Sequence, residues 1–153
     1  MSKDNEGEQS LDPVMAFFRN IAVIEQLSRA RMERALPDGM QASHFGVLSH
    51  MCRMDRRKSP AELANIFQVA RPSMTNTLQK LAAKGYILIE EDPNDGRGKL
   101  VQITSKGRQV FSQAIQTIAP LYKDTIDTLG IDLFKELLLG LDKVRSYMDN
   151  NRS

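Results

Sequence analysis

The segment spanning residues 59–104 most constrains how this chain can fold, because it predicts two short helices followed directly by a β-hairpin. The run SPAELANIF has Ser59 in the N-cap position, Pro60 at the first helical position and Glu62 three residues after the cap, which together make a capping box. The run RPSMTNTLQKLAAKG predicts a second, longer helix that ends at Gly85. Two short helices joined by a few residues, the second with a polar side, indicate a helix-turn-helix.

A predicted hairpin follows the second of these helices. The runs YILIEE and KLVQIT are rich in β-branched and apolar residues, and the segment PNDGRG between them is predicted to form the turn. Ile87 and Ile89 share one face of the first strand, and Val101 and Ile103 can oppose them from the second. Because an isolated hairpin is marginal in water, we expect this apolar face to pack on the preceding helices.

Helical periodicity extends over the rest of the chain. Apolar residues spaced three and four apart predict a helix over 13–36, with Asp12 as its cap and Pro13 in its first turn. A second such helix covers 42–54, and helical spacing returns from Ser105 onward. The sequence therefore predicts a mainly α fold with one small β-hairpin, in which a winged helix-turn-helix is flanked by helices.

Two apolar stripes are long for a chain whose middle must also form a core. One runs from Val14 to Leu27 and the other from Phe134 to Met148. Burying them against a second copy of the chain is the economical solution, so we expect a homodimer. The expected organisation is one domain overall, with a disordered tail over 1–10, dimerisation helices over 11–36 and 106–150, and the winged helix-turn-helix over 40–105.

Basic residues are concentrated in the middle of the chain. Between Arg53 and Arg108, eleven Lys and Arg stand against six acids, so this block carries a net charge of +5 whereas the whole chain carries +2. Such a distribution favours an anionic partner for the middle segment. A solvated surface with uneven charge is the alternative interpretation.

Several classes of protein are disfavoured by what the sequence lacks. It contains no run of 18 apolar residues, so we expect no membrane span. The polar start has no apolar centre of a secretory signal, and the single Cys52 excludes an internal disulfide framework and suits a cytoplasmic location. No nucleophile motif is present, and His44 and His50 lie six residues apart, so we expect neither an enzyme nor a metal site or cofactor.

The second of the paired helices carries a polar face suited to base edges. A helical wheel places Met74, Leu78 and Leu81 on the side that faces the core. Asn can pair bidentately with adenine, Arg can pair with guanine, and a Thr methyl can touch a thymine methyl. The candidate DNA contacts on this helix are Arg71, Ser73, Thr75, Asn76, Thr77 and Lys80, and the candidate phosphate contacts just before the first helix are Arg57, Lys58 and Ser59. An ordinary exposed helix face is the alternative.

The hairpin tip places Arg97 between two glycines, with Lys99 close behind. A hairpin beside a recognition helix would lie over the neighbouring minor groove, where arginine exploits the negative potential. Gly96 and Gly98 would let the backbone approach closely, and we expect Asp95 to hold the guanidinium of Arg97. A flexible surface hairpin with incidental charge is the alternative.

At this point the chain resembles a known family. The runs TNTLQKLAAKGYIL and DPNDGRGKLVQITSKG, together with MQASHFGVL, are similar to the MarR family of bacterial transcription regulators. That family's wing reads Asp-Pro-x-Asp-Arg-Arg, followed by a strand ending Leu/Ile-Thr-x-x-Gly. The matching positions here are Asp92, Pro93, Asp95, Arg97, Ile103, Thr104 and Gly107. The chain departs from the pattern at Gly96, where the first of two arginines is common, and at Ala70, where a capping side chain is common.

The resemblance implies a homodimeric, ligand-responsive repressor that binds a palindromic operator in double-stranded DNA. Its recognition helix would enter the major groove and its wing the minor groove. The resemblance also implies a small aromatic or phenolic effector, bound between the dimerisation helices and the DNA-binding region. The candidate walls of that pocket are Phe17, Ile21, His44 and Met51, which are equally suited to a core.

Two alternatives remain at the level of sequence. One is a winged-helix protein-interaction module that does not bind DNA, which the presence of Arg71, Lys80, Arg97 and Lys99 disfavours. The other is a redox role for Cys52, which lies on the apolar face of its predicted helix and is better explained as a buried thiol.

Overall fold

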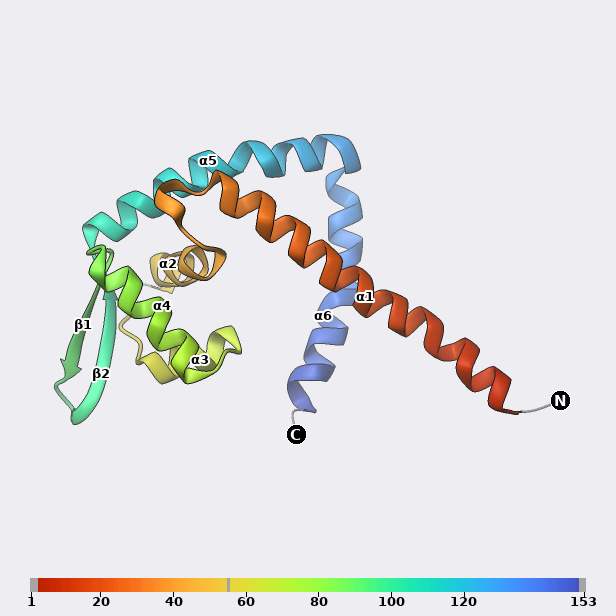
Figure 1. Ribbon diagram of the computed structural model, residues 1–153, viewed down its shortest axis with the longest axis horizontal. Coiled ribbons are helices and arrows are strands. Elements are labelled where there is room, and N and C mark those ends of the chain that lie inside the picture. The colour runs from red at the N-terminus through yellow and green to blue at the C-terminus, as the bar shows by residue number, and fades with distance from the viewer. Residues whose placement is uncertain (1–2, 55, 152–153) are drawn as a thin grey trace. The chain divides into compact units, whose positions relative to one another are not determined.

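The computed structural model describes residues 3–54 and 56–151, with side chains from Leu11 onward (Figure 1). It confirms the mainly α fold with a single two-stranded hairpin among the described residues. The chain divides into two compact units, 1–117 and 118–153. The elements are α1 (Lys3–Ala35), a 3-10 turn η1 (Pro37–Gly39), α2 (Ala42–Met54), α3 (Pro60–Phe67), α4 (Arg71–Ala83), β1 (Ile87–Asp92), β2 (Asp95–Ile103), α5 (Ser105–Leu129) and α6 (Ile131–Asn150). Among the described helices, none combines the length and the apolar content needed to cross a bilayer.

The start of α1 differs from the prediction. The helix begins at Lys3, so residues 3–10 have helical backbone where a disordered tail was expected, and residues 1–2 of that predicted tail lie outside the described part. Lys, Glu and Gln in this stretch are good helix formers, and acidic residues favour a helix N-terminus. Pro13 is therefore an interior residue of α1, not the first-turn residue that we predicted, and Asp12 is not its cap.

The hairpin and the helices before it form the core of the first unit. The register pairs Ile87 with Ile103 and Ile89 with Val101, as predicted. The strand residues Ile87, Val101 and Ile103 are buried together with Leu63 of α3. Contacts of α4 with β1, and of α2 and α3 with β2, place these helices against the strands. The expectation that the apolar face of the hairpin packs on the preceding helices is confirmed.

Local signals set the ends of α3 and α4. The Ser59 side chain accepts a hydrogen bond from the backbone of Glu62, whose carboxylate in turn accepts one from the backbone N–H of Ser59, so the capping box is confirmed. Gln68 then adopts a left-handed conformation (φ 56°) and turns the chain into α4. Ala70 provides no side-chain cap for α4, as its identity predicts. Gly85, with φ 74°, follows the C-terminal end of α4.

A hydroxyl and a glycine join the hairpin to α5. Thr104 precedes the helix, and its Oγ1 accepts a hydrogen bond from the N–H of Gly107 at 3.0 Å. The same hydroxyl lies 2.7 Å from the carbonyl oxygen of Gly85 and 3.1 Å from that of Tyr86. A Cβ atom on Gly107 would lie 2.1 Å from the Tyr86 carbonyl oxygen. The Thr-x-x-Gly spacing therefore has a structural cause, since the first turn of α5 packs directly on the backbone that follows α4.

His44 gives the fold a pH dependence in the weakly acidic range. Its side chain is only 8% exposed, and its Nδ1 accepts a hydrogen bond from the backbone N–H of Gln41 at 3.2 Å. Its Nε2 is buried without a hydrogen-bond partner among the described residues. Burial, followed by the charges of Lys80 and Lys84, lowers the pKa of His44 below 6.5. The charge of Glu33 opposes this shift.

Acidification is therefore expected to destabilise the folded chain. The unfolded chain takes up the proton at about pH 6.5 and the folded chain only at lower pH, so this contribution to stability is complete above 6.5 and is lost as the pH falls through the lowered pKa. We expect urea unfolding at about pH 5.5 to give a lower free energy of unfolding than at about pH 7.5. His44 should contribute at most about 1.4 kcal/mol to this decrease for each pH unit. His44→Gln should reduce that slope. Because the pKa of His50 is also lowered, His50→Gln is measured in parallel to separate the two. A slope unchanged by His44→Gln would contradict this account.

Candidate nucleic-acid interface

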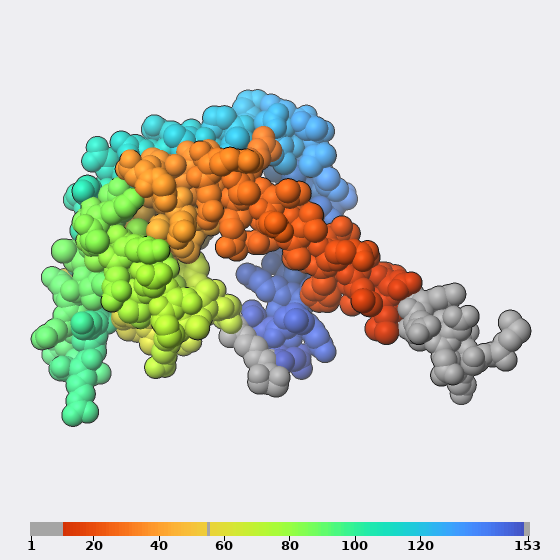
Figure 2. Space-filling model, viewed as in Figure 1, coloured from red at the N-terminus to blue at the C-terminus, as the bar shows by residue number. Residues whose placement is uncertain are grey.

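One groove in the first unit brings together side chains from three elements. Its volume is about 330 Å³, and it lies between the start of α3, the start of α4 and the beginning of β2. The lining residues are Ser59, Pro60, Ala61, Arg71, Thr75, Arg97, Gly98 and Lys99. Five of them were predicted contacts, namely Ser59, Arg71, Thr75, Arg97 and Lys99. Figure 2 shows α4 on the surface of this unit, with the hairpin projecting beside it.

Backbone pairing holds the start of α3 against the hairpin of β1 and β2, which we call the wing. The N–H of Lys58 donates to the carbonyl of Val101 at 3.3 Å, and the N–H of Val101 donates to the carbonyl of Lys58 at 2.8 Å. The capping box then orients Ser59, whose Oγ accepts from the backbone N–H of Glu62 at 3.2 Å. A hydroxyl that accepts in this way can still donate its own hydrogen to a phosphate oxygen. Ser59 is thus held at the edge of the groove.

The other two candidate phosphate contacts are paired with acids. Arg57 lies 3.5 Å from the carboxylate of Glu90, and Lys58 lies 3.8 Å from that of Glu62. Ion pairs at the surface contribute little stability, so either cation can exchange its carboxylate for a phosphate at small cost. Neither residue lines the 330 Å³ groove.

Helix α4 presents the predicted polar face. Met74, Leu78 and Leu81 are buried, which confirms the wheel. Ser73, Thr75, Asn76 and Lys80 are exposed, together with Arg71 at the helix start. Thr77 is half-buried, and its hydroxyl donates to the Ser73 carbonyl at 3.1 Å. The Thr77 hydroxyl is therefore turned toward its own helix, so the methyl group is the part of this side chain better suited to a base.

The wing tip is tighter than the sequence predicted. Its turn consists of residues 93–94 alone, and Asp95 already belongs to β2, whereas a six-residue turn was expected. The carboxylate of Asp92 accepts a hydrogen bond from the backbone N–H of Asn94 at 2.9 Å, which closes this turn. Asp92 pairs with Asp95 across the strands, and the next cross-strand pair is Glu91 with Lys99. Residues 96–98 consequently have no cross-strand partner in that register and form a bulge.

Asp95 acts on the backbone of the bulge. Its Oδ1 accepts a hydrogen bond from the backbone N–H of Arg97 at 3.1 Å, whereas the sequence predicted a contact with the Arg97 guanidinium. A Cβ on Gly98 would lie 3.2 Å from the Cβ of Asp92, whereas a Cβ on Gly96 would meet nothing within 4 Å. Gly98 therefore packs closely against both aspartates, whereas Gly96 has open space around it.

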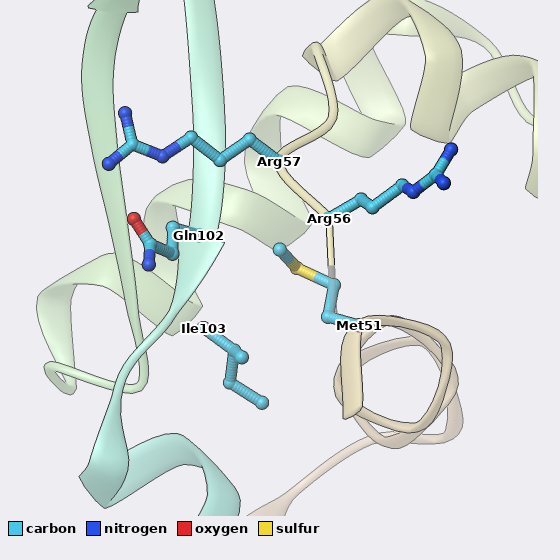
Figure 3. Close-up of a pocket in the computed structure, with 5 residues that line it drawn as sticks. All are labelled: Met51, Arg56, Arg57, Gln102 and Ile103. Carbon is cyan, nitrogen blue, oxygen red and sulfur yellow. The ribbon is translucent and has the colours of Figure 1, made fainter. Parts of the chain in front are cut away.

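Of the four candidate effector residues, Met51 lines one of the two cavities described here. Met51 lines a separate cavity of about 160 Å³ with Arg56, Arg57, Gln102 and Ile103 (Figure 3). The two arginines in that view extend in different directions from the loop after α2. Phe17 and Ile21 are half-buried on α1, and His44 is buried; these three line neither of the two cavities. Among the described residues, no group of three His, Cys, Asp or Glu is arranged to hold a metal ion.

The sequence reasoning missed three residues that line the groove. Pro60, Ala61 and Gly98 form part of its surface, and nothing in their local sequence signals that α3 begins beside the wing. The structural roles of Asp92 and Asp95 were also missed. Here a signal existed, because aspartates two residues before a backbone N–H are typical Asx-turn acceptors.

The fold and this groove define a winged helix-turn-helix protein. Residues 38–98 match the model of the MarR family. The multiple antibiotic resistance protein MarR of Escherichia coli (strain K12) is 29% identical over 123 residues, which cover 80% of this chain and 85% of that protein. The crystal structure of the reduced form of MarR from E. coli is 30% identical, with a TM-score of 0.70 over 82% of this chain and 93% of the other. A mutant of the same protein complexed with operator DNA is 27% identical, with a TM-score of 0.78 over 88% and 96% of the two chains. The chain belongs to the MarR family of transcription regulators.

Proposed function

We propose that this chain is a homodimeric transcription regulator that binds a palindromic operator, with α4 in the major groove and the hairpin in the minor groove. The observation that carries the proposal is the groove, in which Arg71 and Thr75 of α4 face Arg97 and Lys99 of the wing. A relative with this fold has been crystallised with operator DNA. Cations on two elements can position the duplex through its phosphates, while the polar face of α4 reaches base edges.

The proposed dimer accounts for apolar surface that each unit leaves exposed. In α1, Val14, Ile24 and Leu27 are about half or more exposed, at 51%, 64% and 65%. In α6, the exposed apolar residues include Leu137 and Leu138. Water-exposed stripes of this extent are typical of subunit interfaces. We therefore propose residues 11–36 and 106–150 as dimerisation helices and 40–105 as the DNA-binding region.

Two-fold symmetry of the proposed dimer has a consequence for the operator. Its half-sites should be inverted repeats about one helical turn, roughly 10 bp, apart or a multiple of that distance. We further propose that the chain acts as a repressor in the cytoplasm and is released by a small aromatic or phenolic effector. Phe17 and Ile21 of α1 remain candidates for contacting that effector, because they are half-buried beside exposed apolar neighbours.

Selection from a random duplex library with the purified chain tests the proposed function. We expect enrichment of an inverted repeat, and binding that weakens steeply with salt as phosphate contacts release counterions. Absence of any enriched sequence at low salt would contradict operator binding and favour the protein-interaction module.

Asn76 should set base preference more than overall affinity. We expect Asn76→Ala to relax the selected motif at one position of each half-site, by roughly 1–3 kcal/mol of discrimination, while nonspecific binding changes little. The measurement is a repeat of the selection with this variant. Asn65→Ala, which alters an exposed asparagine of α3 instead of α4, is the matched control. A selected motif identical to that of the unaltered chain would exclude Asn76 as a base contact.

A further inference from the structure

The connection between α1 and α2 touches the far end of the recognition helix. Asp38 lies in this connection with left-handed backbone angles (φ 54°, ψ 32°), followed by Gly39 at φ 64°. Its carbonyl oxygen accepts a hydrogen bond from Nζ of Lys84, the C-cap of α4, at 2.8 Å. Its carboxylate lies 3.4 Å from the hydroxyl of Tyr86, which stands immediately before β1. These two contacts join Asp38 to residues that lie 46 and 48 positions later in the chain.

The start of α5 closes the same cluster from another side. Nζ of Lys106 donates to the carbonyl of Lys84 at 2.8 Å and lies 5.5 Å from the centre of the Tyr86 ring. Tyr86 is only 6% exposed. The C-terminal end of α4 is thus tied both to η1, which follows α1, and to the beginning of α5, all within the first unit.

We propose that Lys84 and Tyr86 are positioning residues, whose contacts with Asp38 fix the angle of the recognition helix relative to α1 and so match the two recognition helices of a dimer to the spacing of its half-sites. The inference rests on the function proposed above and adds to it. Neither residue lines the groove.

Helix geometry explains why a contact so far from the groove affects binding. The 13 residues of α4 span about 20 Å at 1.5 Å per residue, with Arg71 and Thr75 near the start and Lys84 beyond the end. A rotation of about 5° about the C-terminal end moves the N-terminal end by roughly 2 Å, several times the roughly 0.5 Å tolerance of a well-formed site. One half-site can accommodate such a rotation by shifting the whole protein on the duplex. In a dimer both recognition helices must meet their half-sites at once, so a shift that corrects the fit at one half-site does not correct it at the other.

The test compares a full operator with a duplex that carries a single half-site. The double variant Lys84→Met with Tyr86→Phe removes both donors and keeps the aliphatic stem and the aromatic ring. Loss of two hydrogen bonds should weaken full-operator binding roughly tenfold, while half-site binding stays within about twofold. The separate variant Lys84→Arg retains a donor and a charge, so it should keep most of the full-operator affinity of the unaltered chain.

The outcomes separate this inference from the proposed function. Failure of the unaltered chain to bind any selected operator would overturn the proposed function itself. Operator binding by the unaltered chain, with the same ratio of full-operator to half-site affinity in the double variant, would overturn only the positioning role. Equal losses on both duplexes would also overturn it, because a general loss of folding or a direct DNA contact lowers both.

A measurement without DNA tests the contact with Asp38 directly. Burial, and then the charge and hydrogen bonding of Asp38, raise the pKa of the Tyr86 hydroxyl above 10.0. Asp38→Asn keeps a side chain that tolerates left-handed angles but removes the charge. We expect the Tyr86 pKa, followed by NMR of ¹³C-labelled tyrosine, to fall in this variant. An unchanged Tyr86 pKa would show that the two side chains are not in contact in solution.

Discussion

Gly107→Ala is expected to lower the free energy of unfolding by about 3 kcal/mol, the largest effect of a single methyl group that we anticipate in this chain. The added Cβ would lie 2.1 Å from the carbonyl oxygen of Tyr86, 3.0 Å from its carbonyl carbon and 2.9 Å from Cγ1 of Ile103. The carbonyl cannot move aside easily, because it accepts a hydrogen bond from the backbone N–H of Thr104 at 3.0 Å. Interiors this densely packed relax only partly around an added atom.

Urea unfolding followed by circular dichroism measures this effect. Gly96→Ala is the matched control, since a Cβ there meets nothing within 4 Å and the same change should alter stability little. Equal stability of Gly107→Ala and the unaltered chain would show that α5 does not pack on the Tyr86 backbone at this distance.

Arg97→Ala is expected to weaken operator binding by roughly 1–3 kcal/mol, the cost of a lost contact in a groove. The residue is exposed in the bulge of β2, and its backbone N–H is held by Asp95. That anchoring leaves the guanidinium available to the groove that it lines with Arg71 and Thr75. Because Gly96 stands where the related wing sequences have a second arginine, Arg97 has no neighbouring arginine to replace it.

Titration of the selected operator with Arg97→Ala, at one fixed salt concentration, gives the affinity. Arg145→Ala removes an equally charged, exposed residue of α6 and should change binding much less. If the guanidinium contacts only phosphates, its loss should instead weaken binding to all sequences alike and reduce the salt dependence of binding. Affinity within error of the unaltered chain would exclude Arg97 from the interface.

Much of the fold could be predicted because its signals are local. The bounds of α2 were predicted as observed, and α3 begins at its capping box because Ser59 and Glu62 satisfy each other's backbone within four residues. That Val101 and Ile103 oppose Ile87 and Ile89 was predicted from the alternation of apolar residues. The start of α1 could not be predicted in this way. Proline is tolerated in a first turn and, at some cost, in the interior of a long helix, so Pro13 did not decide between the two.

The wing tip shows where local rules were applied incompletely. Two glycines suggested a broad turn, but the carboxylates of Asp92 and Asp95 each accept a backbone N–H two residues later, so the turn closes over residues 93–94. The pattern Asp-Pro-Asn-Asp contained that information. The close approach of Gly98 to both aspartates did not follow from the sequence, because it depends on where the bulge returns to the strand.

The sequence by itself determined the order of helices and strands, the buried face of α4 and the residue types offered to DNA, because capping, periodicity and charge act within a few residues along the chain. Only the tertiary structure decided which of those residues share one groove. Ser59, Arg71 and Arg97 come together because the backbone of Lys58 pairs with Val101, across more than forty positions of sequence. The contact of Asp38 with Lys84 and Tyr86 has the same origin. Contacts between distant segments depend on how the whole core packs, and no local pattern encodes them.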